Sequence, residues 1–107
     1  TPDGEFYPCH QFVGRSGYLL GDVKRGLVRR DLVEVFAGAD IHHKQGCLAC
    51  WARYFCGGGC HANAELHHGT IFQPDEIGCR LLRKRLECAL GIQAILAGEQ
   101  GDKRREA

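Results

Sequence analysis

Four cysteines lie within fourteen residues of this sequence, at Cys47, Cys50, Cys56 and Cys60, with the spacing C-x2-C-x5-C-x3-C. A C-x2-C pair lets two sulfurs reach one metal from a single tight turn. The three glycines at 57–59 tolerate positive φ, so peptide N–H groups can point at sulfur. Such hydrogen bonds tune iron–sulfur clusters. A run of ligands this dense predicts a metal site.

Three further cysteines lie outside this run, at Cys9, Cys79 and Cys88. We expect Cys79 on the first turn of a long C-terminal helix, where the helix dipole favours a thiolate. Cys88 follows nine residues later, on the opposite side of that helix and about 13 Å further along its axis. One metal centre cannot take both residues. The pattern therefore favours Cys79 as a ligand and Cys88 as a buried small hydrophobe.

The six remaining candidate thiols exceed what one tetrahedral site can use, which leaves two centres, or one centre and spare thiols. Zinc and iron–sulfur clusters both accept cysteine ligands. Zinc modules usually separate two ligand pairs by roughly 12 to 20 residues, so this compact quartet favours a cluster, and zinc stays open. Disulfides are disfavoured because seven cysteines is an odd number and no secretory segment is visible.

Residues near these thiols have less specific patterns. We expect His10 to be a hydrogen-bond donor beside Cys9. The remaining five histidines, His61 and two adjacent pairs, are predicted to be solvated loop residues. The aromatic residues of the cysteine run are predicted to pack around the site and exclude water: Trp51, Tyr54 and Phe55.

A length of 107 residues allows one domain at most, and 15 glycines indicate a loop-rich chain with a modest core; the net charge is only +1. That charge gives no reason to expect nucleic acid or an anionic membrane as a partner. No apolar run approaches the roughly 20 residues that span a bilayer. Turn residues at positions 1–4 imply a preceding strand, so we expect an N-terminally truncated piece of a larger protein.

The predicted fold class is α+β: an N-terminal β-hairpin, metal-cluster loops and a long C-terminal helix. We expect strands over residues 5–7 and 18–20, and a short helix capped by Asp31 and ended by Gly38. A helical turn over 61–68, an extended segment at 70–72 and a long helix from about 76 to 97 should follow. Residues 1–98 would form one domain, and 99–107 a polar disordered tail.

Gly4-x4-Cys9, the C-x2-C-x5-C-x3-C run and the later Cys79 together resemble the SPASM domain of radical SAM enzymes. The resemblance spans about residues 4 to 79. The sequences of residues 7–14 (YPCHQFVG) and 52–63 (ARYFCGGGCHAN) are similar to those of maturases of the SCIFF type. Residues 83–90 also resemble their C-terminal helix. Anaerobic sulfatase maturases share the cysteine pattern and stay open as an alternative.

The resemblance implies two auxiliary [4Fe–4S] clusters. It assigns Cys9 and Cys60 to the inner cluster, together with a further upstream cysteine that this chain lacks. It assigns four residues to the outer cluster: Cys47, Cys50, Cys56 and Cys79.

The resemblance implies a parent enzyme that installs thioether cross-links in a ribosomally made precursor peptide, in the cytoplasm. The domain would take part in electron transfer and substrate positioning. The C-x3-C-x2-C motif of the SAM-cleaving cluster is absent, because Asn63 stands where its third cysteine would follow Cys60. The chain would therefore be inactive alone, with its partners the radical SAM barrel domain and the precursor peptide. A zinc-stabilised binding module without a redox role is the alternative.

Overall fold

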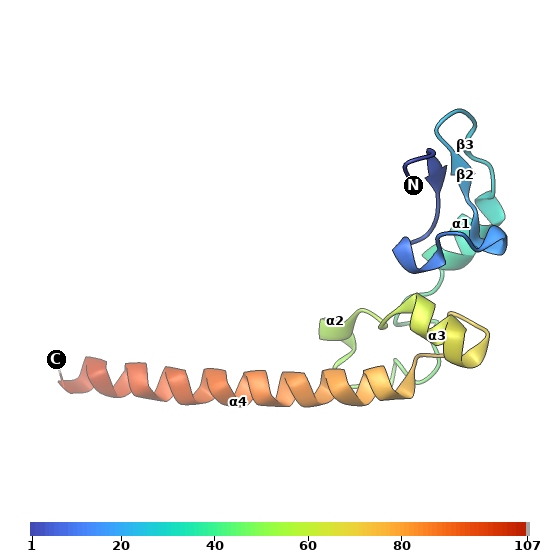
Figure 1. Ribbon diagram of the computed structural model, residues 1–107. Helices are drawn as coiled ribbons and strands as arrows, with labels where there is room; N and C mark the ends of the chain where they lie inside the picture. The colour runs from blue at the N-terminus through green and yellow to red at the C-terminus, as the bar shows by residue number, and fades with distance from the viewer. Residues whose placement is uncertain (107) are drawn as a thin grey trace. The chain divides into compact units, whose positions relative to one another are not determined.

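The computed structural model describes residues 1–106, with side chains through Gly101. The chain falls into two units, Thr1–Asp75 and a second that begins at Glu76. Within the described residues the first unit holds a three-stranded antiparallel sheet and short helices, and the second is one long helix (Figure 1). The fold class is therefore α+β, as the sequence predicted.

The sheet consists of three two-residue strands in the order β1-β2-β3: Glu5–Phe6, Gly21–Asp22 and Gly26–Leu27. Glu5 pairs with Asp22, and Gly21 pairs with Leu27. A Cβ atom at Gly21, where φ is +154°, would overlap the carbonyl oxygen of Gly26, so only glycine fits this close strand approach.

The turn between β2 and β3 depends on one side chain. The Asp22 carboxylate accepts the backbone N–H groups of Lys24 at 2.9 Å and Arg25 at 2.8 Å. These hydrogen bonds, led by the one from Arg25, hold the pKa of Asp22 below its usual range. The aspartate thereby closes the hairpin with local hydrogen bonds.

The rest of the first unit is built from short helices. Two 3₁₀ turns and three α-helices follow one another: η1 His10–Phe12, η2 Ser16–Tyr18, α1 Arg30–Ala37, α2 Arg53–Cys56 and α3 His61–His68. Gly69 ends α3 in the left-handed conformation with φ of +70°, and its N–H donates to the Glu65 carbonyl at 2.7 Å. The predicted helix over 61–68 and its glycine stop are confirmed.

A small core holds this unit together around Phe12, which is fully buried. The Phe12 ring lies 4.3 Å from that of Tyr18 and 5.5 Å, edge to face, from that of Phe36, measured between centroids. Four buried residues form the centre of the cluster: Phe12, Ala39, Ala62 and Ile71. Because two of the four are alanines, the apolar area that stabilises this unit is small.

Three local predictions are wrong. Residues 18–20 do not form a strand, since Tyr18 closes η2 and turns its ring into the core. Residues 70–72 lie in bends and turns, with Ile71 buried. Asp31 does not cap α1; it lies in the first turn and pairs with Arg29 at 2.8 Å. In each case a tertiary or side-chain contact replaced the local preference.

The second unit is α4, Glu76–Glu106. It begins where the sequence predicted and continues beyond 97, through most of the predicted disordered tail. Residues 99–106 include Glu, Gln, Lys and Arg, which favour a helix enough to carry it across Gly101. Ala107 lies outside the described residues. No helix within 1–106 combines the length and apolar character needed to cross a membrane.

Candidate metal centre

The first pair of candidate ligands lies on a tight turn, as the C-x2-C spacing predicted. The backbone N–H of Cys50 donates to the carbonyl of Cys47 at 3.0 Å. Cys47 is buried and Cys50 is half-buried. Both residues therefore lie on one backbone turn, and both are at least partly shielded from water.

The third candidate, Cys56, closes the four-residue helix α2 and is half-buried. Gly57 ends that helix in the left-handed conformation, with φ of +70°, and its N–H donates to Arg53 at 2.9 Å. Gly58 and Gly59 also have positive φ, +104° and +72°. Because an L side chain rarely adopts these values, the three glycines are required for the sharp return of the chain from Cys56 toward Cys60.

A buried lysine supports this glycine loop. Lys44 is only 3% exposed, and its Nζ donates to the carbonyl of Gly58 at 2.8 Å. A Cβ atom on Gly58 would lie 3.2 Å from Lys44 Cδ, which is closer than normal packing allows. Burying an ammonium group is costly unless nearby groups compensate its charge. Lys44 therefore brings a buried cationic side chain against the backbone of the glycine loop between Cys56 and Cys60. Sequence reasoning missed Lys44, since no pattern distinguishes it from exposed lysines.

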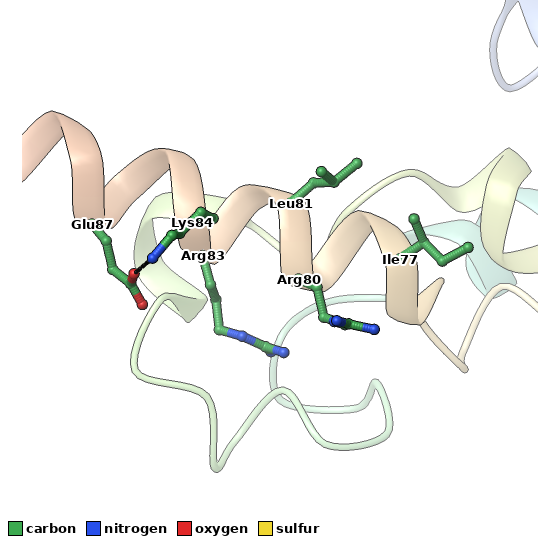
Figure 2. A pocket seen from close by; sticks show the side chains of 6 residues that line it. All are labelled: Ile77, Arg80, Leu81, Arg83, Lys84 and Glu87. Carbon is green, nitrogen blue, oxygen red and sulfur yellow. Dashed lines mark hydrogen bonds and ion pairs between the residues drawn. The ribbon is translucent and has the colours of Figure 1, made fainter.

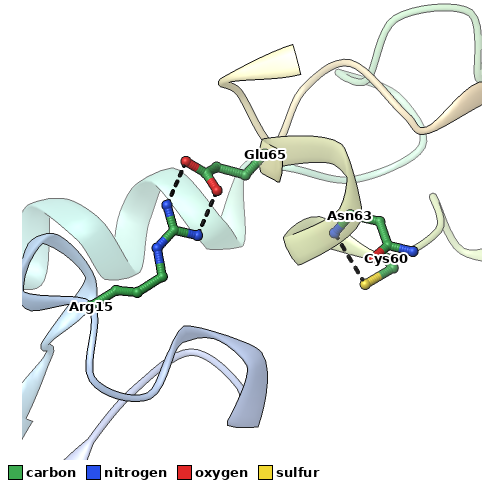
Figure 3. A network of polar contacts seen from close by, with 4 residues as sticks. All are labelled: Arg15, Cys60, Asn63 and Glu65. Atoms are coloured by element: carbon green, nitrogen blue, oxygen red, sulfur yellow. Dashed lines mark hydrogen bonds and ion pairs between the residues drawn. The ribbon is translucent and has the colours of Figure 1, made fainter. Parts of the chain in front are cut away.

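Cys60 is the N-cap of α3 (Figure 3). Its Sγ accepts the backbone N–H of Asn63 at 3.5 Å, which satisfies one of the free N–H groups at the helix start. The residue is exposed. The thiol therefore has a structural role that the sequence did not predict.

The same helix is tied to the segment before β2 by an ion pair. Arg15 donates two hydrogen bonds to the Glu65 carboxylate, at 2.6 and 2.8 Å (Figure 3). Its guanidinium also lies 4.8 Å above the ring of Tyr18. These hydrogen bonds hold the pKa of Glu65 below its usual range. The pair fixes the helix that Cys60 caps against the core.

His61 is not the solvated residue that the sequence predicted. Its ring is half-buried, meets Phe36 edge-on at 5.5 Å, and has a buried Nδ1 without a hydrogen-bond partner among the described residues. Burial, and then the charge of Lys44, lower the pKa of His61 from its ordinary value. The imidazole is therefore neutral at pH 7. His42 and His43 are exposed, as predicted.

The remaining cysteines differ in their surroundings. Cys9 is half-buried and packs against the core, and the neighbouring His10 is exposed. Cys79 lies on the first turn of α4, as predicted, and is half-buried. Cys88 is exposed, so the prediction of a buried hydrophobe is wrong, because α4 presents that position to solvent.

The aromatic side chains of the cysteine run are exposed instead of packed over the thiols. The exposed fractions are 49% for Trp51, 73% for Tyr54 and 67% for Phe55, with Leu48 beside them at 60%. Arg53 covers one face of the Tyr54 ring at 4.7 Å. The prediction that these rings exclude water from the site is therefore wrong. These four exposed apolar side chains all belong to the cysteine run.

Five of the cysteines are free thiols: Cys9, Cys50, Cys56, Cys60 and Cys88. Among residues 1–106, no three side chains of Cys, His, Asp or Glu converge in a group that could hold a metal ion. A ready-made coordination shell is therefore not part of the described conformation. In comparisons with known proteins, no family model and no curated protein matches this chain.

Proposed function

We propose that this chain is the auxiliary [4Fe–4S] cluster domain of a cytoplasmic radical SAM maturase that forms thioether cross-links in a precursor peptide. The observation that carries the proposal is the segment from Cys47 to Cys60. It combines cysteines at the motif's spacing, three left-handed glycines and the buried Lys44, which donates to the carbonyl of Gly58.

The residues proposed for the outer cluster are Cys47, Cys50, Cys56 and Cys79, and those for the inner cluster are Cys9 and Cys60. Such a cluster, when bound, supplies a one-electron acceptor near the peptide. Lys44 would offset part of the negative charge of the thiolates, and its hydrogen bond to Gly58 would keep the return loop in place. Since no three candidate ligands converge among residues 1–106, metal binding would order the loop, and metal affinity would contribute to folding.

The exposed surface of Leu48, Trp51, Tyr54 and Phe55 supports a partner beside the candidate centre. Aromatic residues are enriched in protein interfaces, and this short segment exposes three of them together with Leu48. Under the proposed function, the partners of this domain are the radical SAM barrel and the precursor peptide. This surface would then bring the peptide close to the thiols.

Anaerobic reconstitution tests the proposal. The chain should take up about four iron and four acid-labile sulfide for the outer cluster, with the visible absorption of an iron–sulfur centre. Cys56→Ala and Cys79→Ala should lose most of this iron. Cys88→Ala is the matched control, since it removes an exposed thiol from the same helix as Cys79 and should retain full iron. A colourless protein with one stoichiometric zinc would instead establish the zinc-stabilised module.

A further inference from the structure

The first three turns of α4 carry a surface hollow of about 580 Å³ (Figure 2). It is lined by two aliphatic, three cationic and one acidic side chain: Ile77, Leu81, Arg80, Arg83, Lys84 and Glu87. The two aliphatic residues are 64% and 54% exposed. All six belong to one helix, so the hollow is a property of the second unit alone.

The charges in this hollow are unbalanced. Lys84 donates to Glu87 at 2.9 Å, so the only carboxylate lining the hollow is already paired. Arg80 and Arg83 have no ion pair with any residue of the described part of α4. Figure 2 shows both guanidinium groups extending from the same side of the helix. Two unpaired cations therefore lie next to an exposed apolar patch.

We propose that this hollow docks an acidic helical peptide segment that carries two carboxylates three residues apart and an aliphatic side chain directly after the second one, so that all three share one face. Arg80 and Arg83 are one helical turn apart, which places their Cβ atoms about 5–6 Å from each other. Two carboxylates three residues apart on a helical peptide match that separation, and guanidinium groups bind carboxylates in a bidentate manner. The aliphatic side chain of the peptide lies against Ile77 and Leu81.

The apolar part of the hollow distinguishes this ligand from a polyanion. A nucleic-acid backbone would leave Ile77 and Leu81 in contact with phosphate and water, and the chain as a whole carries a net charge of only +1. An acidic, amphipathic segment satisfies both the guanidinium groups and the aliphatic side chains. The docking does not depend on a bound metal, and its failure would leave the proposed cluster function intact.

Fluorescence anisotropy tests this proposal with a fluorescein-labelled peptide that carries two glutamates three residues apart and a leucine directly after the second glutamate. The full chain should bind it at low salt, more weakly as salt rises. Arg80→Gln and Arg83→Gln should each weaken binding about three- to fivefold, the range of exposed ion pairs. Leu81→Ser should also weaken it. The matched control is Arg85→Gln, which makes the same charge change outside the hollow and should alter binding less than twofold.

Several results would overturn the proposal. An equal loss with Arg85→Gln would indicate unspecific charge attraction. Equal binding of a peptide with glutamine in place of both glutamates, or no binding at millimolar peptide, would remove the role of the carboxylates. Equally tight, arginine-dependent binding of a labelled single-stranded oligonucleotide would assign the hollow to nucleic acid. Sedimentation showing a dimer that Leu81→Ser disrupts would assign it to a second copy of the chain.

Discussion

Replacing Cys60 by serine or by alanine separates its observed role as the cap of α3 from its proposed role as a cluster ligand. The Sγ atom accepts one backbone N–H at 3.5 Å, from Asn63. Serine can make the same hydrogen bond with a stronger acceptor, and alanine cannot make it. Neither substituent supplies the thiolate that iron–sulfur clusters require. The two variants should therefore differ in stability and agree in cluster content.

The size of the stability effect follows from the cap geometry. Removing a good N-cap costs about 0.5–2 kcal/mol, and a thiol at 3.5 Å belongs at about the lower end, roughly 0.5 kcal/mol. A change of 1 kcal/mol moves the Tm of a domain this small by about 4–8 °C. Cys60→Ala should therefore lower the Tm of the metal-free chain by about 2–4 °C. Cys60→Ser should match the unaltered chain or exceed it by a similar amount.

Thermal melts followed by circular dichroism measure the first effect on the metal-free chain. Iron analysis of the proposed parent maturase, expressed with each substitution, measures the second. In that enzyme both variants should still cleave SAM to 5′-deoxyadenosine and fail to form the thioether, with both products quantified by mass spectrometry from one reaction. Identical Tm values for serine and alanine would refute the capping argument. Full inner-cluster iron in both variants would refute the ligand assignment.

Two further perturbations test the first unit. The hydrogen bonds from Arg15 lower the pKa of Glu65, so their stabilisation is complete above the ordinary glutamate pKa, about 4.3, and is lost as the pH falls through the lower folded value. The Tm difference between the unaltered chain and Glu65→Gln should shrink toward zero below about pH 4, and a constant difference would contradict this. Gly58→Ala should destabilise the metal-free chain by about 1–3 kcal/mol, because φ is +104° and the new Cβ meets Lys44. Gly14→Ala is its control in urea melts, with φ of +84° in open space; an equal loss there would exclude the Lys44 contact as a cause.

Local signals in the sequence predicted several elements correctly. Gly69 ends α3 in the left-handed conformation, which glycine adopts without a side-chain penalty. Gly38 also follows the last residue of its helix, α1, but keeps right-handed dihedrals there. The strand at Glu5–Phe6 and the start of α4 at Glu76 were also predicted. Each of these depends on the conformational preference of a few neighbouring residues. No distant contact is needed to specify them.

Predictions that depended on burial succeeded less often. Tyr18 has a strand-favouring side chain, and its packing against Phe12 and Phe36 places it in a 3₁₀ turn. Trp51 and Tyr54 were predicted to be buried around the thiols, and both rings are exposed. Burying an apolar side chain lowers the free energy of the folded state. The hydrophobicity of a residue does not specify which part of the protein will cover it.

The sequence by itself determined the thiol set, its spacing and the glycines that turn the chain between Cys56 and Cys60, since these follow from residue identity and backbone freedom. Only the tertiary structure decided that Lys44 is buried against Gly58, that burial lowers the pKa of His61 and that Cys60 caps a helix. Burial, pKa and capping are set by atoms brought together from separate parts of the chain. Their energies depend on distance and solvent exposure, which residue identity does not specify.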